Sequence, residues 1–449
     1  MRKNDATEPL FLHFGIPKSE LGAEFQKVSD ELDRLDNLPH ILELILEDLC
    51  DGRSSDMGNR GMKPEMVLRA AVLRQFQNWT YRELEFHLSD SPTFRSFCRL
   101  PIAWSPSRAC LQRNIGAIKD TTWKALRREI LRSAKKAGLE TGERVRIDST
   151  AVKSPIKHPT DSGLLYDAVK ALTRILGEFP VGSSVKFTNH TRRAKKRARQ
   201  IALLTGKKGA KAKRLVHYKD LLKVARMARG YAVAALANQA ACAQAPHLEG
   251  LLRGMLELTD KIISQTYRRV VLEEMVPAKD KVVSIYETHT DIIEKGGRET
   301  VFGHKVFLTG GRSSMILDCV VEQGNPNDST RVQSMLERVK DIMGAYPEKA
   351  SFDAGFTTKD NVDWAEEHEE IKDVSFGAKG KIPVHKAVRS SWMYKNLARF
   401  RAGIEGCISM LKRTFGMGAS TWKGWEHFKQ YVQLAVVSHN LLALSRLRS

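Results

Sequence analysis

The stretch RVRIDSTAV, residues 144–152, decides how the fold of this chain is read. Val145, Ile147 and the β-branched residues that follow predict a β-strand, with Asp148 near its end. Helical periodicity precedes this strand, and it returns from about residue 163 to residue 275. The sequence therefore predicts a mixed α/β domain whose first strand is followed by a large helical insertion.

Further strands are expected after the insertion, separated by glycine turns. Five segments have this character: KVVSIYETHTDII (281–293), KVFLTGG (305–311), MILDCVVEQG (315–324), KASFDAGF (349–356) and KDVSFGAK (372–379). A helix is expected to begin near Asp328, and the chain from Leu397 onward reads as mostly helical. The α/β domain thus has about five strands.

The N-terminal part of the chain reads as a series of short helices. Apolar residues recur at helical spacing over residues 20–50, where Pro39 is expected to separate two helices. Thr80 and Glu83 form a capping box, which predicts a helix from about residue 81. The helices of residues 62–137 have basic faces, a pattern that suits a helix-turn-helix-like DNA-binding region. A purely structural helical bundle is the alternative.

The chain of 449 residues is strongly basic, with 73 Lys and Arg against 52 Asp and Glu and a net charge of +21. Residues 186–229 concentrate this charge, with 16 Lys and Arg and a single acid, Asp220. A concentrated positive field indicates a polyanionic partner, for which double-stranded DNA is the first candidate. RNA, an anionic membrane surface or an inert solvated helix would give the same composition. The expected DNA-binding residues are Arg192, Arg193, Lys195, Lys196, Arg197, Lys207 and Lys208.

Several classes of protein are excluded. The six cysteines are scattered and none forms a C-x-x-C pair, which argues against a zinc site, an iron–sulfur cluster or a disulfide framework. No run of about 18 apolar residues is present, so no membrane-spanning helix is expected. The first twenty residues lack the features of a signal peptide, and we expect a cytoplasmic protein.

Three carboxylates stand out by their context. Asp148 ends one predicted strand, Asp353 ends another before a glycine turn, and Glu405 lies in the helical segment FRAGIEGCISMLKR. Because strand ends meet at one edge of a sheet, the two aspartates could lie within a few ångströms of each other, and a helix packed on the sheet could add the glutamate. Such clusters hold Mg²⁺, and paired ions promote phosphodiester cleavage. A structural role for each acid is the alternative.

The predicted helix around Glu405 groups three charged residues. Arg401, Glu405 and Lys412 fall at about 0°, 40° and 20° on the helical wheel, in one narrow stripe. The adjacent apolar face contains Leu397, Phe400, Ile404, Ile408, Leu411 and Phe415. The stripe would then lie at the margin of the packing interface, where Glu405 could reach a metal and the two cations could face phosphates. A surface Arg–Glu pair explains the same spacing.

The R-x(3)-E-x(6)-K arrangement of these residues resembles the signature around the catalytic glutamate of DDE transposases from bacterial insertion sequences. RIDST, GHKVFLTGGRSSMILDCVVEQGNPNDS, FDAGF and WMYKNLARFRAGIEGCISMLKRTFGMG together resemble a transposase of the ISNCY group or a close relative. The resemblance covers most of the chain. It implies a ribonuclease-H-like catalytic fold, the triad Asp148, Asp353 and Glu405, and two Mg²⁺ or Mn²⁺ ions held by these acids.

The resemblance also implies an activity and an organisation. The activity is metal-dependent DNA cleavage and strand transfer at terminal inverted repeats, carried out by a homodimer or larger assembly on DNA. The alternatives are an inactive DNA-binding derivative and another nuclease of the same fold. We expect an N-terminal region over residues 1–140, a catalytic domain formed by residues 141–160 and 281–449, and a basic helical insertion over residues 161–280.

Two features depart from the resemblance. The wider signature has a tyrosine three residues before the arginine, but this chain has Ala398 there, with Tyr394 one helical turn away as a possible substitute. The insertion follows the first strand, whereas in other DDE transposases it commonly lies between the second aspartate and the glutamate. Other polar residues are expected to be mainly structural: Asp318, His289, Asp291, His304, Asn325 and Asp328.

Overall fold

The computed structural model describes residues 20–52, 61–101, 104–180, 185–295 and 299–448. The chain divides into two compact units. Unit 1 contains Met1–Pro155 and Gly303–Ser449, and unit 2 contains Ile156–Phe302. The finer division of unit 1 into an N-terminal region and a catalytic domain remains a prediction.

Unit 1 begins with seven helices among its described residues. They are α1 (Glu20–Asp33), α2 (Leu38–Cys50), α3 (Pro64–Gln77), α4 (Tyr81–Asp90), α5 (Pro92–Phe97), α6 (Arg108–Ala117) and α7 (Asp120–Lys136). The expected capping box starts α4, because the Thr80 hydroxyl accepts from the Glu83 amide and the Glu83 carboxylate accepts from the Thr80 amide. Pro39 lies in the first turn of α2, where its missing N–H is tolerated, so the expected separation of α1 from α2 is confirmed.

The sheet of unit 1 is mixed and is built around β1 (Arg144–Lys153). On one side β1 pairs antiparallel with β3 (Glu299–Gly310), which pairs antiparallel with β4 (Ile316–Val321). On the other side β1 runs parallel to β5 (Lys349–Phe352), and β5 runs parallel to β6 (Asp373–Ser375). The order β4–β3–β1–β5–β6 is the mixed α/β arrangement expected of a ribonuclease-H-like domain.

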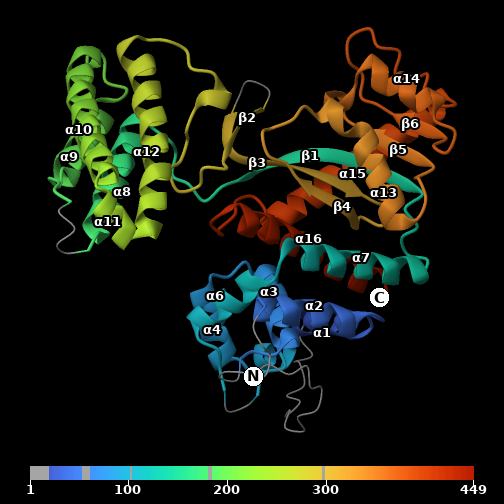
Figure 1. Cartoon of the computed structure of the whole chain (residues 1–449). Helices are drawn as coiled ribbons and strands as arrows, with labels where there is room; N and C mark the ends of the chain where they lie inside the picture. Colours follow the sequence, from blue (N-terminus) through green and yellow to red (C-terminus); the bar gives the residue numbers. More distant parts are fainter. Residues whose placement is uncertain (1–19, 53–60, 102–103, 181–184, 296–298, 449) are drawn as a thin grey trace. The chain divides into compact units, whose positions relative to one another are not determined.

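Helices cover this sheet. They include α13 (Val332–Met343), α14 (Lys359–Glu367), α15 (Ser391–Arg413) and α16 (Trp425–Leu447), with short 3₁₀ turns at Asp328–Arg331 and Ala354–Phe356. α15 contacts β1, β5 and β6. α16 is buried along most of its length and packs on β4, α1, α3 and α7, so it lies between the N-terminal helices and the sheet (Figure 1). One hydrophobic core therefore joins the N-terminal helices to the sheet.

A buried charge cluster ties four elements of unit 1 together. Asp318 of β4 is fully buried, and its carboxylate accepts from Arg127 of α7 at 2.8 Å and from Arg338 of α13 at 2.5 and 2.9 Å. Gln433 of α16 accepts from Arg127 at 2.9 Å. Burial alone would raise the pKa of Asp318, but the charge of Arg127 and the hydrogen bond from Arg338 outweigh it and hold this pKa below its usual value.

Unit 2 is a helical body with its own hydrophobic core. Its main helices are α8 (Asp161–Glu178), α9 (Thr191–Leu204), α10 (Lys211–Ala237), α11 (Gln239–Gln244) and α12 (Pro246–Thr266), followed by a π-helical turn at Tyr267–Val271 and a 3₁₀ turn at Ala278–Asp280. The basic run falls on α9, the following loop and α10. The predicted helical insertion after the first strand is thus present (Figure 1).

One predicted strand was wrong over most of its length. Residues 281–290 form no strand, and only β2 (Asp291–Lys295) is extended, pairing with β3. The alternation of apolar and polar residues arises here because Val283 and Ile285 are buried in an irregular segment. No helix among the described residues is long and apolar enough to cross a membrane.

We expect Asp318→Asn to destabilise the protein by about 3–5 kcal/mol, because Arg127, only 1 % exposed, would be left buried without a counterion. Chemical denaturation monitored by circular dichroism measures this loss.

The matched control is Asp373→Asn. Asp373 is equally buried, but the side chain of its partner Arg389 is 60 % exposed and can be hydrated when unpaired. An equal loss of stability in both variants would contradict a special role for the buried cluster.

A second prediction concerns pH. His439 of α16 is buried and donates from Nε2 to the Ser314 carbonyl at 3.0 Å, and burial lowers its pKa to about 4. The unfolded chain binds a proton near pH 6.5, so stability falls as the pH drops from about 6.5 towards 4, by on the order of 3 kcal/mol for this group. In His439→Gln, unfolding midpoints measured across this range should show a shallower slope, and an unchanged slope would contradict the assignment.

Candidate functional site

The two predicted aspartates lie at the same level on neighbouring chain segments. The parallel register of β1 and β5 ends with the pair Ile147 and Phe352, so Asp148 and Asp353 each follow one member of this pair. Asp353 directly follows the end of β5, as predicted, whereas Asp148 is the fifth of the ten residues of β1 and does not end its strand, because β1 continues in its pairing with β3. Neighbouring strands lie about 4.8 Å apart. The sheet therefore brings together these two positions, which are 205 residues apart in the chain.

Alternation along β1 places Asp148 on the side of the sheet that α15 covers, and Asp353 follows directly after a strand that contacts the same helix. Arg146, two residues before Asp148, donates to the Phe400 carbonyl of α15 at 3.1 Å. Ser351, two residues before Asp353, donates to the Leu397 carbonyl of the same helix at 3.1 Å. The helix packs so closely that a Cβ at Gly403 would collide with the Arg146 guanidinium, which would have to move to accommodate it.

The charged stripe of α15 exists, and Tyr394 joins it. Tyr394 falls at about 20° on the wheel, between Arg401 and Glu405. Its hydroxyl donates to the Phe376 carbonyl at 3.0 Å, and the following residue, Gly377, donates its amide to the Phe352 carbonyl beside Asp353. Tyr394 thus anchors the stripe next to the end of β5.

Glu405 itself lies at the outer margin of this interface. Its side chain is 63 % exposed and forms an i,i+4 pair with Arg401 at 3.4 Å. Among the residues that the structure describes, no three His, Cys, Asp or Glu side chains are grouped closely enough to hold a metal ion. The structure therefore brings Asp148 and Asp353 to adjacent positions, but it does not bring Glu405 into a group with them.

A further carboxylate near Asp353 was not predicted as part of the site. Asp328 accepts from the Ser149 hydroxyl at 3.2 Å and from Lys305 at 3.0 Å. A Cβ at Gly355 would lie 3.0 Å from Asp328 and 2.9 Å from Asp353, so the two acids flank the same turn. The segment NPNDS reads as an ordinary turn and helix cap, and only the tertiary structure links it to Ser149.

The other polar residues of the sequence have structural contacts. Asp318 belongs to the buried charge cluster, as expected of a structural residue. His304 is buried against the rings of Trp425 and Phe428, with centroids 4.7 and 4.8 Å away. In unit 2, His289 lies 2.9 Å from the Glu287 carboxylate.

The cations of α9 fall into two groups. Arg193 and Arg197 both pair with Asp220 of α10, so they hold two helices of unit 2 together. Arg192, Lys195, Lys196 and Arg199 are exposed at spacings of three and four residues, and they form the stripe that we call the α9 cationic face. Lys207 and Lys208 are exposed in the loop that follows.

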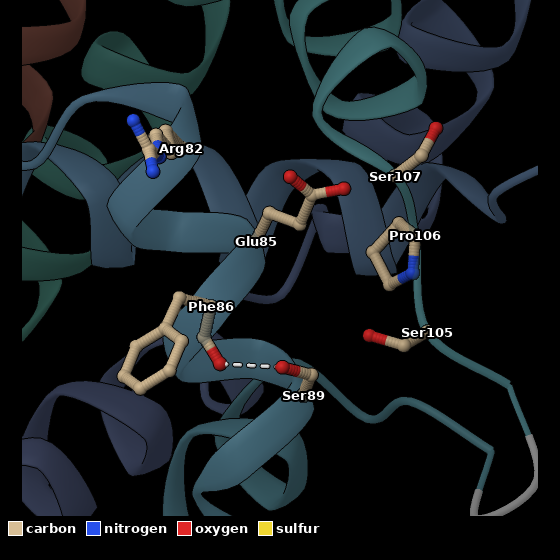
Figure 2. Close-up of a pocket in the computed structure, with 7 residues that line it drawn as sticks. All are labelled: Arg82, Glu85, Phe86, Ser89, Ser105, Pro106 and Ser107. Carbon is tan, nitrogen blue, oxygen red and sulfur yellow. Dashed lines mark hydrogen bonds between the residues drawn. The ribbon is translucent and has the colours of Figure 1, made fainter.

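Two pockets lie among the N-terminal helices. The smaller one, about 510 Å³, is an open hollow between α4 and the segment that leads into α6 (Figure 2). Arg82 and Glu85 line it, and Glu85 accepts from the Arg108 amide at 2.9 Å. The second pocket, about 950 Å³, is lined by residues of α3, α4, α6 and the segment between α15 and α16.

Comparison with known proteins gives two family matches. The model described as "Transposase DDE domain" matches residues 281–441, and the model described as "Transposase domain (DUF772)" matches residues 23–115. The first match includes Asp353 and Glu405, whereas Asp148 lies outside both. No curated protein and no solved structure matches the chain.

The matches cover both the N-terminal helices and the strands and helices after the insertion. They do not single out the ISNCY group. Taken with the mixed sheet around β1, they show that this chain belongs to the DDE transposases of insertion sequences.

Proposed function

We propose that this transposase hydrolyses a phosphodiester at each end of its insertion sequence and then joins the freed 3′-hydroxyl to target DNA. The single observation that carries the proposal is that Asp148, on β1, and Asp353, directly after β5, follow the last pair of the parallel register. α15, the helix that carries Glu405, packs on both of these strands. Membership in the DDE transposases supports the same reaction.

The donor set suits a hard divalent cation. Asp148, Asp353 and Glu405 would supply only carboxylate oxygens, which Mg²⁺ and Mn²⁺ accept. When bound, a pair of such ions would activate the attacking oxygen and stabilise the leaving one. Completion of the triad requires the exposed Glu405 side chain to turn from Arg401 towards the strand ends, which its solvent-exposed position permits.

The cations of α15 have a separate role in the proposal. Arg401 and Lys412 lie in the same stripe as Glu405, so they would face the phosphates on either side of the scissile bond. Arginine suits this task because its planar guanidinium binds two phosphate oxygens together. Tyr394 would hold the stripe in register with Asp353 through its bond to Phe376.

Unit 2 supplies a DNA-backbone contact in this proposal. The α9 cationic face, Lys207 and Lys208 carry charge that acids of unit 2 do not neutralise in any described ion pair. Binding to the backbone releases counterions, so the affinity falls steeply with salt. Because two DNA ends must be handled in one reaction, we infer a homodimer or larger assembly on terminal inverted repeats.

One observation favours a second candidate function. Since the described residues contain no three-carboxylate group, a DNA-binding protein that does not cleave would have the same fold. The cleavage assay below decides between the two.

We expect Asp353→Asn to abolish Mg²⁺-dependent nicking of a duplex that carries the element's terminal DNA, while binding to that duplex changes less than about threefold, or roughly 0.7 kcal/mol. The amide removes the charge that holds a cation but preserves the size of the side chain. Gel separation of labelled strands measures nicking, and fluorescence anisotropy measures binding.

Asp360→Asn, an exposed carboxylate of the nearby helix α14, is the matched control and should cut normally. Cleavage by Asp353→Asn at the wild-type rate would remove Asp353 from the site. No cleavage by the wild-type protein would favour the non-cleaving alternative.

A further prediction tests the α9 cationic face. Replacing Arg192, Lys195, Lys196 and Arg199 with Gln should reduce the slope of log affinity against log salt by up to about 0.9 for each lost phosphate contact. Anisotropy titrations at several salt concentrations give this slope. Arg193 and Arg197 are left in place because their loss would also release Asp220.

The control removes the same number of charges elsewhere in unit 2, at Lys170, Arg174, Arg253 and Lys261, all of which are exposed. This variant should keep the wild-type slope. If both variants lower the slope equally, net charge and not the α9 cationic face determines binding.

A further inference from the structure

Arg74 of α3 is a buried cation without a counterion. The residue is 5 % exposed, and no described carboxylate lies within ion-pair distance of its guanidinium. Its guanidinium donates a hydrogen bond to the Thr421 hydroxyl at 3.4 Å, and its Nε has no hydrogen-bond partner. The guanidinium lies 4.5 Å from the centroid of the Tyr81 ring and 5.8 Å from that of Trp422.

This arrangement differs from that of other buried arginines in unit 1. Arg69, also on α3, pairs with Asp33 and Glu65, and Arg127 pairs with Asp318. Arg146 is also not paired with a carboxylate of the described residues, but α15 packs over it, and it donates to the Phe400 carbonyl and the Ser314 hydroxyl. Arg74, in contrast, lines an open pocket of about 950 Å³.

The rest of the pocket is cationic and aromatic. Arg113 of α6 and Lys423 of the segment between α15 and α16 stand exposed at its rim, together with His427. Trp79 and Tyr81 contribute rings to its wall. Asp and Glu are absent from the residues that line it. An uncompensated positive site with a wide opening fits an anionic ligand, since burying a lone charge is costly unless a partner neutralises it.

We propose that this pocket, which we call the Arg74 pocket, binds a backbone phosphate of DNA. The guanidinium of Arg74 forms the floor, Arg113 and Lys423 contact the same or the neighbouring phosphate, and Trp79 contacts the attached sugar or base. The rim spans the N-terminal helices and the segment that leaves α15. A strand held there is fixed to the helix that carries Glu405, so the inference rests on the proposed function for the identity of its ligand.

The first test uses rim variants that leave the core intact. Arg113→Gln with Lys423→Gln should weaken duplex binding and reduce the salt slope by up to about 2, from about 0.9 for each contact. Arg82→Gln is the matched control, because Arg82 lies on α4 and lines the smaller pocket beside Glu85. An unchanged slope in the double variant overturns the proposal.

The second test separates a ligand-binding arginine from a structural one. Arg74→Met removes the charge and keeps much of the volume, so the free protein should melt at the same or a higher temperature while DNA binding weakens. Arg69→Met should melt lower, because it removes the ion pairs of Arg69 with Asp33 and Glu65, although Arg99 remains paired with both acids. A lower melting temperature for Arg74→Met together with an unchanged salt slope overturns the proposal.

A third measurement identifies the source of the phosphate. Inorganic phosphate and AMP, at matched ionic strength, should raise the melting temperature of the wild-type protein less than a short duplex does, and the gain from the duplex should shrink in the rim variant. Saturable stabilisation by AMP but not by duplex, lost in the rim variant, would assign the pocket to a free nucleotide and overturn the DNA assignment.

The closing comparison keeps the two proposals apart. If the rim variant nicks and binds DNA normally while Asp353→Asn loses nicking, the proposal for the Arg74 pocket is contradicted and the catalytic proposal stands. If the rim variant binds DNA more weakly but the wild-type protein does not nick it, the catalytic proposal is contradicted and the proposal for the pocket is retained.

Discussion

The buried carboxylate of Asp318 is the constraint on which the arrangement of unit 1 depends. It lies on β4, which pairs with β3 at one side of the sheet, and its two arginine partners, Arg127 of α7 and Arg338 of α13, are 211 residues apart in the chain. A charge in this position excludes any packing of α7 on the sheet that does not bring Arg127 to it. The N-terminal helices and the sheet are thereby held in one register.

The elements that depend on neighbouring residues in the sequence were predicted correctly. The capping box at Thr80 and Glu83 placed the start of α4, and the strand character of residues 144–152 matched β1. The helical wheel grouped Arg401, Glu405 and Lys412, and the contacts of Phe400 and Ile404 with the sheet side agree with the predicted apolar face. These features follow from backbone geometry and side-chain periodicity, which a single sequence contains.

Features set by long-range contacts escaped prediction. Apolar and polar residues alternate in the segment 281–290 as they do in a strand, but the segment is irregular. The alternation reflects the burial of Val283 and Ile285 and does not reflect an extended backbone. The basic run looked uniform, yet Asp220 divides it into two arginines that hold helices together and a face that stays free of acids. The sequence did not mark Asp328 or Arg74 as site residues, because each contacts a residue that is distant in the chain: Ser149 for Asp328 and Trp422 for Arg74.

The cationic side chains fall into two groups: those paired with carboxylates, which stabilise the fold, and those without such partners, which we propose to contact a ligand. Four arginines form ion pairs with carboxylates of the same chain, and these pairs stabilise the fold: Arg69, Arg127, Arg193 and Arg197. Arg74 and the α9 cationic face meet none among the described residues, and the free protein carries the cost of their repulsion and desolvation. Binding of an anion would lower this cost. Arg74 contacts Thr421 in the segment that follows α15. A phosphate bound there, as we propose, would lie close to the end of the helix that carries Glu405, whose own pair with Arg401 is exposed. Asp148 lies within β1 and Asp353 directly follows β5, so the sheet fixes the backbone positions of both. In our proposal, DNA binding would therefore act on Glu405, the one member of the proposed triad whose side chain the fold leaves exposed.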